Sequence, residues 1–489
     1  MLSRRAFVAA MAAAPVTARL AAAARRQEHA VVVGAGAFGG WTALALLRAG
    51  MRVTLVDAWG AGNSRASSGG ETRVIRAVYG GVSRYSEMAA RAFALWREAE
   101  RRWERQVFFR TGALWLCAGD DRYVRDSAAP MERAGLALVE LTPADAARRW
   151  PQMRFGEDVR TVFHEPEAGF LTARVACELV RGTFVREGGE WRQAWARPGA
   201  TTGARLSGVA LGDGATLAAD HFVFACGPWM GQLFAEVVGR RIVATRQEVF
   251  FFGTPPGDAR WDATALPTWV HIGERMAYGV PSHDGRGLKV ADDTAGPEVD
   301  PTTQDRVPSA AGLAGARAIL RARFPELADA PLLEARVCQY EASSDGHYLV
   351  DRHPGLENVW LVGGGSGHGF KMGPAVGEHA AAVVLGQAAV EPMFAYGRLQ
   401  APHRAAWCGF RGGWSLAVGR RTATDDTTPP GVIRARAAAG RGRLRRAARL
   451  PCGPRHAAAP AAARRRTSAP PRPAPAPPPP RARRLRAPS

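Results

Sequence analysis

Short apolar runs and Ala/Leu-rich stretches alternate along the chain from residue 30 onward. Residues 30–33 and 52–56 are β-branched runs of the length of one buried strand. Between them, residues 38–49 have the composition and length of a helix, and Gly50 stands where a helix C-cap belongs. The order strand, helix, strand predicts a βαβ unit, and with it an α/β fold.

The same patterns predict further elements as far as residue 399. Helices are expected at 86–104, 143–150, 172–187, 308–324 and 374–385. Strands are expected at 108–117, 221–225, 241–252, 268–280 and 358–362. Thr142 and Asp145 resemble a capping box before the second of these helices. We expect the strands at 241–252 and 268–280 to belong to a second, antiparallel sheet.

Three glycines follow the first predicted strand at GxGxxG spacing, namely Gly34, Gly36 and Gly39. The first permits a tight turn, the second lets a pyrophosphate approach the backbone, and the third lets the helix press against the strand. Asp57 ends the second strand, where it can accept hydrogen bonds from a ribose diol. The stretch predicts an adenine dinucleotide but does not separate FAD from NAD. A glycine-rich turn in an ordinary α/β unit is the alternative.

The net charge of +21 is concentrated at the two ends of the chain. Residues 401–489 hold 20 Arg and two acids, and residues 1–29 hold five Arg and one Glu. Residues 30–400 therefore carry a net charge of −1. A nearly neutral body gives no electrostatic surface for nucleic acid, so we expect no nucleic-acid partner for the folded part.

Cysteine and lysine usage narrows the candidates for chemistry. The six cysteines form no CxxC pair and no zinc spacing, so we expect neither a disulfide framework nor a metal site. Of the 65 basic residues, only Lys289 and Lys371 are lysines. Arginine cannot replace a compact ammonium whose pKa shifts on burial. Both lysines are therefore candidates for chemistry, against the alternative of chance survival on the surface.

Both ends of the chain differ in composition from the body. Residues 3–8, SRRAFV, resemble a twin-arginine export motif, and residues 21–24 could supply a small-residue cleavage site. We expect export to the periplasm, with a disordered N-terminus in a cytoplasmic protein as the alternative. Pro15 and Arg19 interrupt the apolar run, so no membrane-spanning helix is expected. The Arg/Pro/Ala-rich residues 401–489 cannot bury a core and are expected to be a disordered, solvated tail; a nucleic-acid or membrane tether is the alternative.

Four segments together resemble one family. They are the dinucleotide motif, the loop at 60–76 that ends with Arg73 and Arg76, the GLK segment at 287–289, and the turn at 363–371 that ends SGHGFK. Over about 30–399 the chain is similar to the monomeric sarcosine oxidase and N-methyltryptophan oxidase group of the D-amino-acid-oxidase-like FAD oxidoreductases. The resemblance implies FAD, held by a Rossmann-like domain beside a mixed antiparallel-sheet substrate domain, α+β overall.

The resemblance implies roles for both lysines and for three other residues. Lys289 matches a lysine that lies over the flavin and assists the reaction with oxygen, since a cation stabilises newly formed superoxide. Arg76 and Lys371 match two cations that bind the substrate carboxylate, although Arg76 could equally form a structural ion pair. Tyr278 and Tyr340 match aromatic positions near the substrate, and each could equally belong to the core.

The resemblance also implies the residues that bind the cofactor. Cys338 matches a cysteine that is bonded covalently to the flavin in sarcosine oxidases; a buried strand cysteine with non-covalent FAD is the alternative. The other residues expected at the cofactor are Ser67, Thr72, Arg73, Gly227, Gly365, Gly367 and His368.

We expect domains that are discontinuous in sequence. The FAD-binding domain is expected at 30–108, 168–238 and 336–400, and the substrate domain at 109–167 and 239–335. The remaining ranges are the export signal at 1–29 and the tail at 401–489.

The reaction that the resemblance implies is oxidation of a secondary amino acid, N-methyl or cyclic, to an imine. O₂ is the expected acceptor, hydrogen peroxide the product, and a monomer the expected state. A dehydrogenase with a quinone or protein acceptor and a non-catalytic flavin-binding protein are the alternatives. Sarcosine oxidases have a histidine four residues past the GLK lysine, where this chain has Asp293. That difference argues against sarcosine and favours a substrate with an additional positive or donor group.

Overall fold

The computed structural model describes residues 27–399, and the predicted export signal and tail lie outside this range. A six-stranded sheet has the order β21–β22–β15–β1–β2–β9. Neighbouring strands are parallel except for β21 with β22. The strands are β1 His29–Val33, β2 Arg52–Asp57, β9 Glu190–Gln193, β15 His221–Phe224, β21 Leu349–Arg352 and β22 Val359–Gly363. The fully buried β1 and the largely buried β2 are the apolar runs that predicted the βαβ unit.

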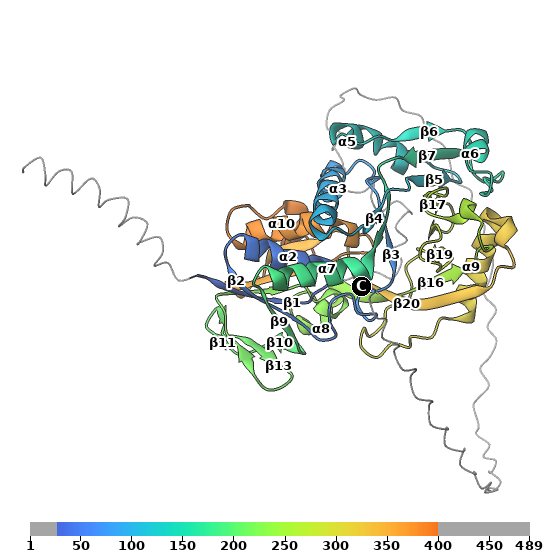
Figure 1. The fold of residues 1–489 in the computed structure, drawn as a ribbon. Coiled ribbons are helices and arrows are strands. Elements are labelled where there is room, and N and C mark those ends of the chain that lie inside the picture. The colour runs from blue at the N-terminus through green and yellow to red at the C-terminus, as the bar shows by residue number, and fades with distance from the viewer. Residues whose placement is uncertain (1–26, 400–489) are drawn as a thin grey trace, which may run out of the picture. The chain divides into compact units, whose positions relative to one another are not determined.

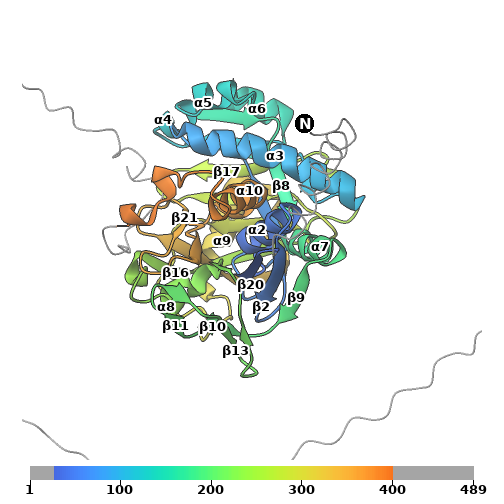
Figure 2. The same cartoon turned by 90° about the vertical axis from the view of Figure 1, so that its left-hand side faces the viewer.

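Helices cover one face of this sheet (Figures 1 and 2). They are α2 Ala37–Arg48, α7 Ala173–Arg186 and α10 Gly373–Val384, with the long α3 Ser83–Trp103 crossing above them. A Cβ on Gly377 would lie 2.6 Å from the carbonyl carbon of Trp41, so this glycine lets α10 approach α2 closely. Trp41 then packs edge-on against Trp96 of α3, with ring centroids 5.3 Å apart.

Small antiparallel sheets lie on the other side of the six-stranded sheet (Figure 1). Their strands are β10 Ala196–Pro198, β11 Thr201–Thr202, β12 Arg205–Leu206, β13 Val209–Leu211 and β14 Thr216–Leu217. The short helix α8 Met230–Leu233 follows β15. Their apolar side chains form a core with those of β1 and β15.

A second sheet has eight strands in the order β20–β16–β19–β18–β17–β5–β7–β6 and lies beside the first (Figure 1). All of its strand pairs are antiparallel except β17 with β5. The strands are β5 Ala113–Cys117, β6 Val139–Leu141, β7 Thr161–Glu165, β16 Ile242–Phe252, β17 Thr268–Ile272, β18 Ala277–Val280, β19 Leu288–Asp292 and β20 Leu332–Ser343. Its helices are α4 Arg122–Arg125, α5 Ala128–Arg133, α6 Pro143–Arg149 and α9 Ala310–Arg323. The mixed antiparallel sheet that the sequence predicted is therefore confirmed.

A three-stranded sheet, β3–β8–β4, completes the fold. Its strands are β3 Thr72–Ile75, β4 Phe108–Phe109 and β8 Gly169–Thr172. β3 carries Arg73 and is followed directly by Arg76, so two of the predicted cations leave the same short strand. β20 is continuous from 332 to 343, across the expected domain boundary at residue 335.

Two predicted strands were wrong in extent. The strand expected at 108–117 is broken, because β4 and β5 pair in different sheets and Gly112 between them has φ +75°. The strand expected at 268–280 is a hairpin of β17 and β18. In both cases a short polar segment with a glycine, residues 110–112 and 273–275, lies between the strands and was included in the predicted strand. The capping box is confirmed, since Asp145 N donates to Thr142 Oγ1 at 3.1 Å. Within 27–399, no helix combines the length and apolar character that a membrane span requires.

Candidate active site

The first glycine turn joins β1 to α2 in the way the motif predicts. Gly34 has φ +104°, and a Cβ on it would lie 2.2 Å from the carbonyl oxygen of Ala225. A Cβ on Gly39 would lie 1.9 Å from the carbonyl oxygen of Gly34, so only glycine allows the helix to pack here. Gly36 faces Ser68, and it lines a cavity together with Gly34. Gly39 therefore serves packing rather than direct contact.

Asp57 lies at the carboxyl end of β2 and lines the same cavity. One carboxylate oxygen accepts from Ala35 N at 2.8 Å, and the other accepts from Trp59 N and Gly60 N, each at 2.9 Å. Burial raises the pKa of this carboxyl, and the three backbone N–H groups act in the opposite direction. Asp57 thus holds the first turn in place while presenting its carboxylate to the cavity.

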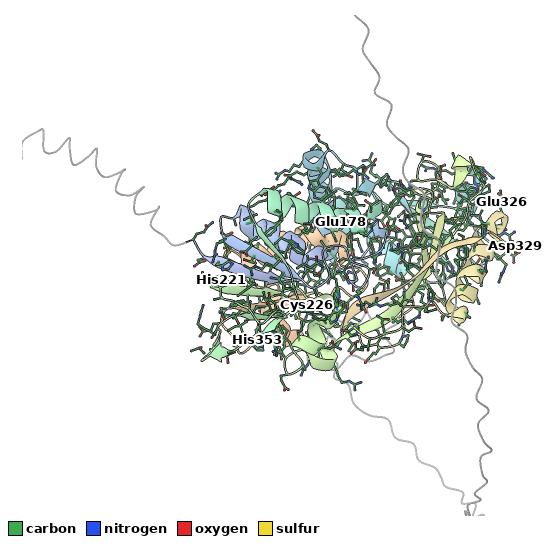
Figure 3. The ribbon with its side chains drawn as sticks, turned by 60° about the horizontal axis from the view of Figure 1, so that its bottom comes forward. Glu178, His221, Cys226, Glu326, Asp329 and His353 are labelled. Carbon is green, nitrogen blue, oxygen red and sulfur yellow. The ribbon has the colours of Figure 1, made fainter. Side chains whose placement is uncertain are left out.

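The cavity, which we call the cofactor cavity, has a volume of about 280 Å³ and lies at the carboxyl ends of the parallel strands. Figure 3 shows His221 at the outer end of β15 and Cys226, just past its inner end, near the centre of the molecule. Of the residues predicted to bind the cofactor, those that line the cavity are Gly34, Gly36, Asp57, Ser67, Arg73, Gly227, Gly365 and Gly367.

One end of the cofactor cavity is lined by aromatic side chains that the sequence analysis did not predict. The Trp59 ring lies 4.7 Å from that of Trp195 and 4.9 Å from that of Trp229, measured between centroids. Arg65 stacks on Trp59 at 5.3 Å. The three tryptophans come from segments far apart in sequence, so only a search for tryptophan after each parallel strand could have indicated them.

The second glycine turn follows β22 and forms the opposite end of the cofactor cavity. Gly367 has φ +75°, and a Cβ on it would lie 2.8 Å from the Tyr340 ring. Gly365 and Gly367 line the cavity with Phe370. The His368 ring points elsewhere: Nδ1 lies 2.8 Å from the Tyr348 hydroxyl and Nε2 lies 3.0 Å from the Gly346 carbonyl. His368 therefore lines the neighbouring cavity and not the cofactor cavity.

That neighbouring cavity, the substrate cavity, has a volume of about 210 Å³. It shares Arg73, Tyr340, Gly367 and Phe370 with the cofactor cavity, so these four residues lie where the two cavities meet. All of the residues predicted for the substrate, apart from Lys289, line it. They are Arg76, Tyr278, Tyr340 and Lys371.

Arg76 and Lys371 bring two cations to the substrate cavity. The Arg76 guanidinium lies over the rings of Tyr79 and Trp115, at 4.5 and 5.1 Å, and donates to the Val78 carbonyl. Lys371 is 4% exposed, and its Nζ donates to the His368 carbonyl at 2.9 Å. Burial lowers the pKa of Lys371 well below its usual value, and the neighbouring Arg76 adds to this effect. Neither cation forms an ion pair with an acid among residues 27–399, so each can bind an anion.

Asp293 faces the same cavity from the segment after β19. Its Oδ1 accepts from the Tyr340 hydroxyl at 2.7 Å, and burial raises the pKa of the carboxyl. Asp293 therefore lies in the same cavity as Arg76 and Lys371, and it orients Tyr340. Arg73 and Glu274 also line this cavity.

Lys289 lies in a third, small cavity of about 30 Å³, on β19. It is 2% exposed, its Nζ donates to the Thr72 carbonyl at 3.0 Å, and it lies 5.1 Å from the Tyr278 ring centroid. Burial, reinforced by Arg73, lowers its pKa to about 7. Thr72 therefore contacts this lysine through its backbone, and it does not line the cofactor cavity.

Cys338 lines the same small cavity from β20. Arg73 Nη2 lies 3.4 Å from its Sγ. The guanidinium also donates to the carbonyls of Ser67, Gly69 and Thr72. Arg73 lines all three cavities, so a cation lies beside both the thiol and the junction where a flavin ring would lie.

The residues of the cofactor cavity fit an adenine dinucleotide with a flavin ring. Two buried oxygens that lie on the cavity wall, Ser67 Oγ and Glu341 Oε1, have no partner among residues 27–399. The two turns present backbone N–H groups where a side chain would block the approach. These donors suit phosphates and ring heteroatoms.

Comparison with known proteins agrees with this geometry. The family model DAO, FAD dependent oxidoreductase, matches residues 29–383. Monomeric sarcosine oxidase of Bacillus sp. (strain B-0618) is 28% identical over 71% of this chain and 90% of its own. N-methyl-L-tryptophan oxidase of Salmonella arizonae is 28% identical over 73% of this chain and 94% of its own.

Solved structures show the same fold. L-proline dehydrogenase from P. horikoshii has a TM-score of 0.67 at 20% identity, over 76% of this chain and 98% of its own. A modified fructosyl peptide oxidase from Aspergillus nidulans has a TM-score of 0.68 at 18% identity, over 78% of this chain and 95% of its own. The chain belongs to the DAO family and is an FAD-dependent oxidoreductase.

Proposed function

We propose that the protein oxidises a secondary amino acid, N-methyl or cyclic, at the carbon–nitrogen bond, with O₂ as the electron acceptor. The substrate loses two electrons and two protons to become an imine, which water hydrolyses. O₂ gains two electrons and two protons and leaves as hydrogen peroxide. Bound FAD supplies the two-electron carrier between these half-reactions. The observation that carries the proposal is that Arg76 and Lys371, which form no ion pair with an acid within residues 27–399, line a cavity that meets the cofactor cavity.

The two cations suit an α-carboxylate. Arg76 is held flat by Tyr79 and Trp115, and Lys371 is held by the His368 carbonyl, so neither side chain needs to be ordered when the substrate binds. A carboxylate between them orients the α-carbon toward the shared wall of Tyr340 and Gly367, where the two cavities meet. N-methyl-L-tryptophan oxidase and sarcosine oxidase are named for substrates of this class.

Asp293 favours a substrate that carries a hydrogen-bond donor or a positive group in addition to its amine. Oδ1 is already used by Tyr340, whereas Oδ2 has no hydrogen-bond partner among residues 27–399. A carboxylate in a buried cavity binds a donor more strongly than an apolar group. In a substrate series matched for size, we expect a hydroxyl- or amine-bearing side chain to give the lower KM, and Asp293→Asn to reduce that preference.

Lys289 is proposed to serve the oxygen half-reaction. Its buried ammonium, in a cavity with Cys338 and Tyr278, would stabilise the negative charge that develops when O₂ accepts its first electron. Cys338 is proposed as the site of covalent attachment, since its Sγ lies 3.4 Å from Arg73, which lines all three cavities where a flavin ring would lie. Trichloroacetic acid precipitation distinguishes the two cases, because only covalent flavin stays with the protein.

An anaerobic screen tests the proposed reaction. Purified protein is mixed with N-methyl and cyclic amino acids without oxygen, and the loss of the flavin absorbance band is recorded. We expect bleaching with at least one of them, then peroxide formation in stoichiometric amount when O₂ is admitted. Bleaching without peroxide, together with electron transfer to a quinone dye, would instead support a dehydrogenase. Flavin that stays oxidised throughout would support a non-catalytic binding protein.

We also propose export by the twin-arginine route, which carries folded proteins and so suits an enzyme loaded with FAD before export. The support is the SRRAFV sequence at residues 3–8. Fractionation of the native host tests it, with replacement of Arg4 and Arg5 by Lys as the variant that should retain the protein in the cytoplasm.

A further inference from the structure

Glu341 is a buried acid in the cofactor cavity that the proposed reaction does not use. It lies on β20, it is 5% exposed, and it lines the cavity. Its Oε2 accepts from Gly365 N at 3.3 Å, whereas Oε1 has no partner among residues 27–399. It forms no ion pair within that part of the chain. Leaving a buried carboxyl oxygen unpaired is costly, so a ligand that provides a donor would relieve the cost.

Glycines make the room for this side chain. A Cβ on Gly363 would lie 2.4 Å from Glu341 Oε1, which is closer than real Cβ contacts come. The Ser366 N–H also donates to the Glu341 carbonyl at 2.7 Å, so the second glycine turn and β20 hold each other. The acid is therefore built into the turn rather than placed beside it by chance.

The position of Glu341 along the cavity identifies which part of FAD it can meet. Cys226 lines the same cavity, and the pKa of its thiol is raised by burial and then by the charges of Glu341 and Asp57. The Cys226 Sγ lies 3.6 Å from the carbonyl of Val33, the residue before the first glycine turn. Glu341 thus lies between the turn that suits the pyrophosphate and the turn that meets the substrate cavity (Figure 3 marks Cys226).

The covalent order of FAD places the ribityl chain between pyrophosphate and flavin ring. That chain carries three hydroxyl groups, each able to donate a hydrogen bond. We propose that Glu341 is a cofactor-binding residue whose Oε1 accepts a hydrogen bond from a ribityl hydroxyl of FAD. This inference concerns the cofactor alone and does not depend on which amine is oxidised.

Binding measurements test the proposal in the full chain with Cys338→Ser, so that flavin stays exchangeable. FAD affinity is measured by titration of flavin-free protein, and ADP, which lacks the ribityl chain, serves as the reference ligand. We expect Glu341→Leu to weaken FAD binding roughly tenfold or more, with ADP binding unchanged within about twofold. Glu341→Gln is expected to lose less, because its amide can still satisfy Gly365 N and donate to a hydroxyl.

Two further arms sharpen the result. FAD analogues that lack one ribityl hydroxyl should bind less tightly than FAD to the parent chain. For the analogue that lacks the hydroxyl bound by Glu341, the Glu341→Leu substitution should cause little further loss of affinity. Glu334→Gln is the matched control, because Glu334 lies on the same strand in ion pairs with Arg286 and Arg336, outside the cofactor cavity. It should leave FAD affinity unchanged.

Three outcomes would overturn the proposal. Glu341→Leu could bind FAD as tightly as its parent, or it could lose affinity for ADP as much as for FAD. The third is that, for every deoxy analogue, the loss of affinity from the missing hydroxyl adds in full to the loss from Glu341→Leu. A shift of the flavin absorbance band at unchanged affinity would place the acid at the ring instead. If the Cys338→Ser chain retains no flavin, the single variants with natural Cys338 are purified and their flavin content is compared. An unchanged flavin content in Glu341→Leu contradicts the proposal. A reduced content in Glu341→Leu, with a normal content in Glu334→Gln, supports it.

Discussion

The first glycine turn and the substrate cavity differ in how far apart in sequence their residues lie. Gly34, Gly36, Gly39 and Asp57 all fall within one βαβ unit, and they also meet Ala225 and Ser68 from outside it. Arg76, Asp293, Tyr340 and Lys371 come from four separate segments. The first site is specified by local geometry, whereas the second is a charge arrangement that exists only after the two large sheets have packed together.

This contrast predicts different failures. Damage to the turn should remove the cofactor and destabilise the fold. Changes in the substrate cavity should leave a yellow, folded protein with altered kinetics. The following experiments test that division.

The largest effect is expected at Gly39. Gly39→Val places a side chain where even a Cβ would lie 1.9 Å from a backbone oxygen, so helix α2 cannot pack against the turn. We expect little soluble protein and no bound flavin, measured by the ratio of flavin to protein absorbance. Gly119→Ala is the control, since a Cβ there meets nothing within 4 Å. A soluble, flavin-loaded Gly39→Val protein would show that the turn tolerates displacement.

Removal of either substrate cation should be the next largest effect. A hydrogen bond to a charged group contributes roughly 1.5–3 kcal/mol, so Arg76→Met and Lys371→Met should each raise KM by about 10- to 150-fold. Flavin content should not change. An analogue of the substrate without its carboxylate should react equally with parent and variants. A similar loss for that analogue would mean that the cations act on the flavin rather than on the carboxylate.

Lys289 should separate the two half-reactions. Lys289→Met is expected to slow the reoxidation of reduced enzyme by O₂ by about 100-fold or more, with the anaerobic reductive step within about threefold of normal. Stopped-flow absorbance measures both. Because burial lowers the pKa of Lys289 to about 7, the reoxidation rate of the natural chain should fall as pH rises above that value. A negative charge on the reduced flavin would raise the pKa of Lys289 and so move this decrease in rate to higher pH. In Lys289→Met the decrease should be absent.

The last effect concerns the stability of the flavin-free protein rather than its activity. Burial raises the pKa of Glu341 from 4.5 to about 7, so the folded chain retains a proton that the unfolded chain has released. Between those pH values stability therefore falls as pH rises, by up to about 3 kcal/mol. Glu341→Gln should remove this pH dependence. In urea unfolding, the free energy of unfolding of the variant should exceed that of the natural chain at pH 8 but not at pH 5.

The sequence predicted most of the elements, since period and turn chemistry are local, and most of the site residues that it indicated line one of the three cavities. Its errors at 108–117 and 268–280 came from joining two apolar runs across a short polar segment, where the sheet partner of each half decides the break. It assigned His368 and Thr72 to the cofactor because they sit in matching motifs, but the His368 ring faces Tyr348 and Thr72 acts through its carbonyl.

By itself, the amino-acid sequence determined the dinucleotide turn, the two lysines and the family, because glycine spacing and an ammonium group have no substitutes. Only the tertiary structure decided that Trp59, Trp195 and Trp229 meet, that Asp293 accepts from Tyr340, and that Glu341 Oε1 has no partner among residues 27–399. The tryptophan and tyrosine contacts join segments 47 to 170 residues apart. Their existence depends on how sheets pack, which no local pattern encodes.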